Sequence, residues 1–98
     1  MIKHIVLWTF KEQAQDKIDD AAKMLISLNG KVPQLLSIEV GRSIFSNGTN
    51  YQLGIVTTFN SVEDLEAYRI HPEHMKVVKF LENIVDKRAN IDFETDVS

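Results

Sequence analysis

The segment from Ile2 to Phe10 constrains the fold most, because its side chains alternate and both phases of the alternation contain large apolar residues. One phase contains Ile2, His4, Val6, Trp8 and Phe10, and the other contains Lys3, Ile5, Leu7 and Thr9. A strand with apolar residues on both sides is typical of the middle of a sheet, where both faces are covered. We therefore expect a sheet with this segment among its inner strands.

The periodicity of the remaining chain predicts two helical regions and three more strands. The expected elements are a helix over 16–28, strands over 36–41 and 51–59, helical segments over 62–70 and 72–85, and a strand over 88–94. Asn29-Gly30 should end the first helix in a left-handed turn, and Asn47-Gly48 should form the turn between the middle strands. Ser61, three residues before Asp64, resembles a helix N-cap.

Pro72 divides the second helical region. Its ring disfavours a helical backbone at His71, and its missing N–H is harmless only in a first helical turn. We therefore expect one helix to end near Ile70 and another to begin at Pro72, with His71 as its N-cap. Glu73 and His74 would then lie in the first turn, where the partial positive charge of the helix favours an ionised Glu73 and a neutral His74.

The order of elements predicts an α+β fold of the ferredoxin-like βαββαβ type, with two helices on one face of a four-stranded antiparallel sheet. The opposite face would mix apolar and polar side chains. These are Ile5, Leu7 and Val56 beside Thr9, Glu39, Gln52 and Thr58. A two-fold homodimer that packs these faces together would remove the apolar surface from water. A monomer that tolerates a modest apolar patch is the alternative.

Composition indicates a single domain over residues 1–98. The 11 basic and 14 acidic residues are interspersed, and the formal charge of −3 argues against nucleic acid as a partner. The chain has no cysteine, which excludes disulfides, thiolate catalysis and cysteine-based metal sites. The opening residues lack the pattern of a signal peptide and no run reaches membrane-spanning length, so we expect a cytoplasmic protein without a membrane partner.

The segment from Tyr68 to His74 concentrates the chemistry, because it holds two of the three histidines and one of the two tyrosines. His74 shares a helical face with Val78, Leu81 and Val85, so its imidazole should point inward. A neutral imidazole at the start of a helix suits a general base. The position suits a packed or capping histidine as well, and the sequence leaves both interpretations open.

Three segments together resemble the stress-responsive dimeric α/β-barrel family, often called Dabb. They are Met1-Ile2-Lys3-His4-Ile5-Val6-Leu7, Phe59-Asn60-Ser61-Val62-Glu63 and Tyr68-x-x-His71-Pro72-Glu73-His74. The resemblance covers nearly the whole chain and implies a protomer whose sheet pairs with a second one to form a barrel at the centre of a dimer. Many members have no assigned reaction, some are associated with stress stability, and a few plant members are polyketide cyclases. Fold alone does not supply function.

The resemblance to the cyclases implies roles for individual residues. His74 corresponds to their catalytic histidine, Tyr68 to their tyrosine and His4 to a strand histidine of the same cavity. Leu53 replaces a further cavity histidine, which implies a more apolar pocket and puts the same substrate in doubt. No cofactor is needed, because the imidazole can remove a proton α to a carbonyl while the phenol stabilises the charge on oxygen. The catalytic candidates are His74 and Tyr68, and the candidate substrate contacts are His4, Trp8, Leu53 and His71.

Several alternatives stand beside a cofactor-free enzyme or binder of a small apolar carbonyl compound. One is a structural dimer of stress physiology whose pocket residues are filler, and another is a small monooxygenase on a related barrel. A metal site from His4, His71 and His74 is a weak signal, because an N-cap residue points differently from a first-turn residue. A cavity of roughly 300 Å³ or more, with Tyr68 and His74 converging on it, would favour the enzyme or binder.

Overall fold

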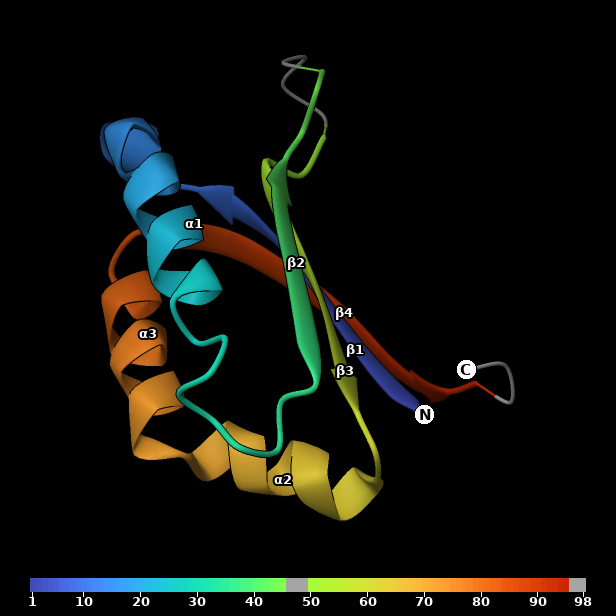
Figure 1. The fold of residues 1–98 in the computed structure, drawn as a ribbon. Coiled ribbons are helices and arrows are strands. Elements are labelled where there is room, and N and C mark those ends of the chain that lie inside the picture. The colour runs from blue at the N-terminus through green and yellow to red at the C-terminus, as the bar shows by residue number, and fades with distance from the viewer. Residues whose placement is uncertain (46–49, 96–98) are drawn as a thin grey trace.

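The computed structural model describes residues 1–45 and 50–95. Its elements are β1 (Ile2–Phe10), the 3-10 helix η1 (Glu12–Lys17), α1 (Ile18–Ile26), β2 (Ser37–Arg42), β3 (Leu53–Phe59), α2 (Val62–Ile70), α3 (Pro72–Glu82) and β4 (Val85–Glu94). The strands form one antiparallel sheet in the order β2-β3-β1-β4. The chain therefore has the predicted ferredoxin-like fold, with the second helical region divided into α2 and α3 (Figure 1).

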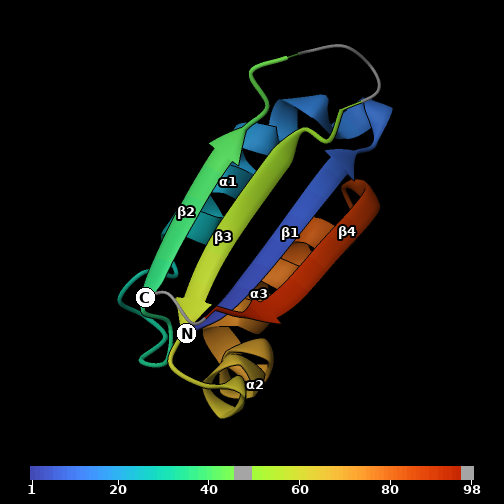
Figure 2. The same cartoon turned by 90° about the vertical axis from the view of Figure 1, so that its right-hand side faces the viewer.

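β1 lies between β3 and β4, as its two apolar faces predict. Its register pairs His4 with Thr57 on one side and with Asp92 on the other. The helices all cover one side of the sheet, so the other side faces the viewer uncovered in Figure 2. None of the described helices is long and apolar enough to span a membrane.

Pro72 occupies the first position of α3, and α2 ends at Ile70 as predicted. The N-caps of α2 and α3 are both side chains. The Ser61 hydroxyl accepts the backbone N–H of Asp64 at 3.1 Å, and His71 Nδ1 accepts the backbone N–H of Glu73 at 3.1 Å. These caps fix the start of each helix and thereby the positions of the residues between them.

The first helical region begins earlier than expected, because η1 precedes α1. It ends in a turn at Gly30, whose φ of 87° is the predicted left-handed conformation. The Asn47-Gly48 turn lies outside the described residues.

Several other boundaries shift by one or two residues, and the largest further differences lie between α3 and β4. α3 ends at Glu82 and β4 begins at Val85, so both boundaries come earlier than the period of the sequence suggests. The carbonyl of Ile84 accepts the backbone N–H of Lys11 at 2.9 Å, which ties the connection to the end of β1. Val85 therefore pairs with Phe10 in the sheet and does not continue the helix.

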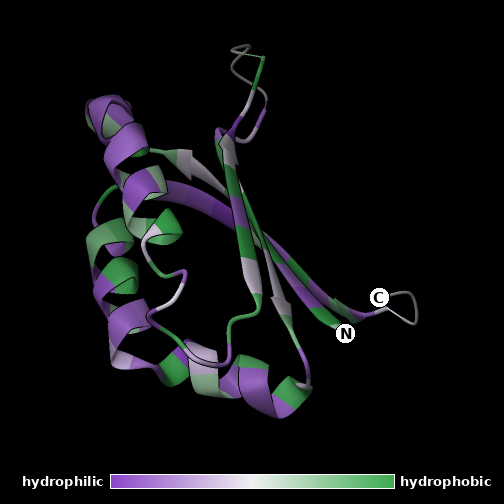
Figure 3. Cartoon of the chain, in the orientation of Figure 1, coloured by the Kyte–Doolittle hydropathy of each residue, from purple (hydrophilic) through white to green (hydrophobic). Residues whose placement is uncertain are grey.

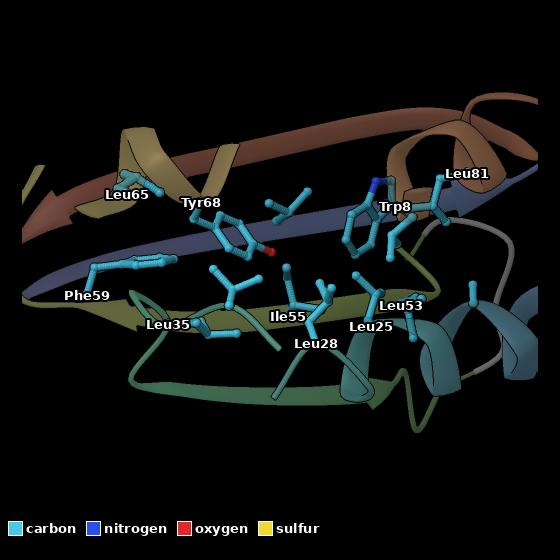
Figure 4. Packing of buried hydrophobic residues seen from close by; sticks show 14 of the residues in the cluster. Trp8, Leu25, Leu28, Leu35, Leu53, Ile55, Phe59, Leu65, Tyr68 and Leu81 are labelled. Atoms are coloured by element: carbon cyan, nitrogen blue, oxygen red, sulfur yellow. The ribbon is translucent and has the colours of Figure 1, made fainter. Parts of the chain in front are cut away.

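The core lies between the sheet and the helices. Tyr68, Phe59, Ile18 and Leu25 are among its largest fully buried side chains. Figure 4 shows Tyr68 entering this core from α2, with its oxygen directed toward the side occupied by Trp8. Hydrophilic residues dominate the part of β4 nearest α3 in Figure 3. The edge of the sheet that β4 forms is therefore polar there.

The bare side of the sheet carries the apolar residues predicted for it, together with a group from β4. Ile5 is paired with Val56 and Ile91, and Lys3 is paired with Phe93. Leu7, Ile91 and Phe93 are exposed in the protomer. The two neighbouring strands β1 and β4 thus present a continuous apolar strip to solvent.

Candidate functional site

A cavity of about 420 Å³ lies between the helices and the sheet. Its buried apolar wall consists of Val6, Trp8, Leu25, Ile55, Val77 and Leu81. Its polar groups are His4, Tyr68, Arg69, His74, Glu82 and Arg88. Both catalytic candidates therefore lie on a cavity of the size that binds small molecules, and the interior is not a solid core.

The break at Pro72 brings Tyr68 and His74 together. Tyr68 lies in the last turn of α2 and His74 in the first turn of α3, on either side of the capping residue His71. Their ring centroids are 4.3 Å apart with an interplanar angle of 39°. A continuous helix would have placed these residues six positions apart along one axis, so the break itself makes the pair.

The Tyr68 side chain is fully buried, and its hydroxyl has no hydrogen-bond partner among the described residues. Phe59 packs against the ring with a centroid distance of 5.0 Å. Burial raises the pKa of Tyr68 to about 12, because the charged phenolate is disfavoured away from water. The phenol is therefore a permanent hydrogen-bond donor at neutral pH that no other described residue uses.

The tautomer of His74 follows from its contact with the backbone. His74 Nδ1 lies 3.1 Å from the carbonyl oxygen of Arg69. A carbonyl only accepts, so Nδ1 carries the hydrogen and Nε2 keeps the lone pair. The ring is thus oriented by α2 and offers Nε2 as a base.

The pKa of His74 is lowered from its ordinary value, chiefly because the ring is desolvated by burial. The hydrogen bond to the Arg69 carbonyl opposes this shift, while the charges of His4, Arg69 and Arg88 add to it. The sequence predicted a neutral His74 from the helix terminus. The direction agrees with that prediction, but the largest cause is burial.

His4 reaches the cavity from β1 and contacts Asp92 of β4 through Nδ1. Asp92 also accepts a hydrogen bond from the side-chain amide of Asn90 at 3.2 Å. The carboxylate therefore holds the imidazole in one orientation. Sequence reasoning missed Asp92, because 88 positions separate it from His4 and only the strand register joins them.

Of the three remaining candidate contacts, one lines the cavity and two do not. Trp8 lines the cavity wall, as expected. Leu53 is buried in the core and is not part of the wall, and His71 turns its ring to the backbone of α3 as a helix cap. Neither Leu53 nor His71 lines the cavity, so the structure does not place them as ligand contacts.

Arg69 and Arg88 are on the cavity wall although the sequence did not single them out. Arg69 lies in the last turn of α2, and Arg88 lies on the helix-facing side of β4, opposite Trp8. The alternation of β4 could have indicated Arg88, because the apolar residues Ala89 and Ile91 face the other side of the sheet and leave the polar residues on the helix side. Among the residues described, no three His, Asp or Glu side chains are grouped to hold a metal ion.

This arrangement can carry out proton transfer on a carbonyl compound. A base with a free lone pair and a neutral phenol donor lie side by side on the wall of a largely apolar cavity. A base and a donor of this kind are the two groups that formation of an enolate requires.

Comparison with known proteins gives a consistent fold. The family profile described as Stress responsive A/B Barrel Domain (Dabb) matches residues 2–95. The stress-response A/B barrel domain-containing protein DABB1 of Arabidopsis thaliana is 29% identical over 95% of this chain and 46% of its own length. The chain thus spans about half the length of this curated relative.

Solved structures extend the comparison. A dimeric protein of unknown function with a ferredoxin-like fold, from Bacteroides fragilis, has a TM-score of 0.85 at 25% identity over 96% of this chain and 95% of its own. The hydroxynitrile lyase of Passiflora edulis has a TM-score of 0.84 at 19% identity over 99% and 94%. An antibiotic biosynthesis monooxygenase has a TM-score of 0.76 at 12% identity over 97% and 98%. The last two likenesses concern the fold alone.

Proposed function

The chain belongs to the Stress responsive A/B Barrel Domain family, and from this premise we propose that its cavity binds a small, largely apolar carbonyl compound and transforms it by acid–base chemistry without a cofactor. His74 is the proposed base and Tyr68 the proposed proton donor. His4, oriented by Asp92, and Trp8 are the proposed substrate contacts.

The observation that carries this proposal is the buried Tyr68 hydroxyl without a partner, next to an imidazole whose Nε2 is free. Leaving a buried hydroxyl unpaired costs about 1–3 kcal/mol. A tyrosine retained only for packing would gain stability by pairing or losing that group. A ligand carbonyl oxygen would supply the missing acceptor, so the cost has a functional explanation.

The proposed step is closure of a dicarbonyl chain. His74 Nε2 takes a proton from the carbon next to one carbonyl, and the electron pair moves to that carbonyl oxygen, which Tyr68 hydrogen-bonds. The enolate carbon then forms a bond to the second carbonyl carbon. The resulting alkoxide takes the proton back from the imidazolium, so no co-reactant is consumed.

Binding requires a small change at the inner end of the cavity. Tyr68 has no exposed surface, so side chains around it must move apart before a ligand touches its hydroxyl. His74 is only partly buried and stands nearer the open side. A ligand that enters past His74 therefore meets the base before the donor.

A proton-exchange assay tests the base without knowledge of the natural substrate. 4-Phenylbutan-2-one in D₂O is the probe, and NMR follows deuterium entry next to its carbonyl. We expect the protein to accelerate exchange and His74→Ala to lower the rate about 100-fold while the chain stays folded. The exchange rate should fall at acidic pH, because protonation of the His74 imidazole removes the base. Since the pKa of His74 is lowered, this fall should occur below about pH 6.5.

His71→Asn is the matched control, since it replaces another histidine three positions away and retains a capping side chain. This variant should have the same exchange rate as the parent protein and the same fall of that rate at acidic pH. Unfolding of His74→Ala, or an unchanged rate in that variant, would contradict the assigned role and favour a packing role for the residue.

The second candidate function is a structural dimer of the stress response without catalysis. Its supporting observation is that Tyr68 belongs to the core and packs on Phe59. It predicts no exchange above background and no binding in the cavity. The described residues offer nothing beyond the fold for the monooxygenase alternative.

We also propose that two protomers pair through the bare sheet face. The exposed strip of Leu7, Ile91 and Phe93 is the surface that such pairing would cover. The similar Bacteroides fragilis protein is described as dimeric, which supports the same arrangement here.

A further inference from the structure

Two arginines stand at the exposed side of the cavity. Arg69 and Arg88 both line it, and both side chains are exposed, whereas Val6, Trp8 and Leu81 on the same wall are buried. Arg69 comes from the end of α2 and Arg88 from β4, so they approach the opening from different elements. The cavity is thus apolar within and positively charged at its margin.

No ion pair neutralises either guanidinium within the described ranges. Arg42 pairs with Asp19 and Lys76 pairs with Glu73, but Arg69 and Arg88 have no such partner there. Arg88 donates one hydrogen bond to the side-chain oxygen of Asn90 at 2.9 Å. Both guanidinium groups therefore keep donors for a ligand.

The other charges around the opening leave a surplus of about one positive charge. Glu82 is the carboxylate on the cavity wall, and it forms no ion pair with either arginine among the described side chains. Asp92 is not among the residues that line the cavity, and its carboxylate is engaged by His4 and Asn90. Two guanidinium groups against one carboxylate match a ligand with a single negative charge.

The arginines also lie near the proposed base. Both line the same cavity as His74, and their positive charges add to the lowering of its pKa, whose largest cause is burial. The Arg69 backbone carbonyl also accepts the hydrogen bond from His74 Nδ1, so the first arginine directly adjoins the base. An anion held between the arginines would therefore lie beside the reacting carbonyl.

We propose that the compound bound here is a keto acid with two ketone groups in its chain, whose apolar part lies against Trp8 and whose carboxylate binds Arg69 and Arg88 at the opening. This inference rests on the proposed function of the cavity and names the class of its substrate. A guanidinium presents paired N–H groups that match the two oxygens of a carboxylate. Glu82 opposes a second negative charge, so a carboxylate suits the opening better than a phosphate dianion.

Binding of matched probes tests this assignment. Trp8 is the only tryptophan of the chain and lines the cavity, so its fluorescence reports occupancy. The probes are 5-oxodecanoate, its methyl ester and decyl phosphate at pH 8. We expect the acid to bind about tenfold more tightly than the ester, a ratio that corresponds to about 1.4 kcal/mol, and more tightly than the phosphate.

The variant Arg69→Gln/Arg88→Gln should abolish the preference for the acid, because it weakens binding of the acid more than binding of the ester. Arg69→Lys/Arg88→Lys should retain part of the preference for the acid. Added salt should reduce this preference in the parent protein. Lys79→Gln removes a charge from the exposed side of α3, away from the cavity, and should change nothing.

The outcomes separate the two proposals. Equal affinity for acid and ester, tighter binding of decyl phosphate, or an acid preference that survives in the double glutamine variant would each overturn the keto-acid assignment. In those cases the cavity would still bind a carbonyl compound. Absence of binding by all three probes would overturn the keto-acid assignment and the proposed function together.

Discussion

The hydroxyl of Tyr68 is a buried polar group whose position works against the stability of the fold. The phenol ring packs on Phe59 and belongs to the core, so its carbon atoms contribute as any buried aromatic does. The oxygen has lost water and gained no protein partner among the described residues. An unpaired buried oxygen lowers the stability of the unliganded protein. Such a group is expected where a bound ligand supplies the missing hydrogen-bond partner.

Tyr68→Phe should therefore raise the free energy of unfolding by about 1 kcal/mol, because the variant buries the same ring without the unpaired oxygen. Urea denaturation followed by Trp8 fluorescence measures the change. The same variant should lose most of the proton-exchange activity, so stability and function move in opposite directions.

Tyr51→Phe is the control, since Tyr51 is the other tyrosine and its side chain is exposed. It should leave both quantities unchanged. A loss of stability in Tyr68→Phe would mean that the hydroxyl has a partner in solution, such as a bound water, and would remove the functional explanation for its burial.

At the scale of elements, the junction of α2 and α3 positions the site. His71 ends one helix and caps the next, and Pro72 prevents the two from merging. The cap is a ring nitrogen that accepts the N–H of Glu73, which leaves His74 one position further into the first turn. The geometry of the base thus depends on a residue that does not touch the cavity.

His71→Ala should lower the free energy of unfolding by about 1 kcal/mol through loss of this cap. His71→Asn should recover most of the loss, because asparagine caps helices well. Thermal and urea unfolding of the three proteins give the comparison. An alanine variant as stable as the parent would show that the ring contributes no capping energy.

The local elements could be read from the sequence because each has a local cause. The β1 segment has apolar residues in both phases, and the Pro72 break follows from the chemistry of one ring. The start of β4 was missed because it depends on the contact between Lys11 and Ile84, which lie far apart in the chain. Periodicity predicts that a segment is a strand but not which of its faces meets the helices.

For the candidate site, the sequence could predict contacts within one helical region but not contacts between distant strands. Tyr68 and His74 lie six positions apart on one helical region, and their meeting follows from the break. His4 and Asp92 meet through the pairing of the first and last strands, which no local pattern specifies. The alternation of β4 places Arg88 on the cavity side only once the register with β1 is known.

At the scale of the whole molecule, the sheet is covered by helices on one side and bare on the other (Figure 2). The bare strip from β1 and β4 includes Ile91, which is 57% exposed in the protomer. A soluble protomer would retain this surface only at a cost in unfavourable hydration. Pairing of two such faces is the arrangement that removes it without a second kind of partner.

Ile91→Glu should convert the proposed dimer to a monomer, because two carboxylates would be buried at the interface without partners. The fold of the protomer should survive, since the side chain is exposed there and surface substitutions usually change stability by less than about 0.5 kcal/mol. Analytical ultracentrifugation gives the assembly state, and circular dichroism gives the fold. Val62→Glu is the matched control, because Val62 is 58% exposed but lies on α2, away from the bare face. A parent protein that sediments as a monomer, or an Ile91→Glu variant that remains a dimer, would show that this face is not the interface.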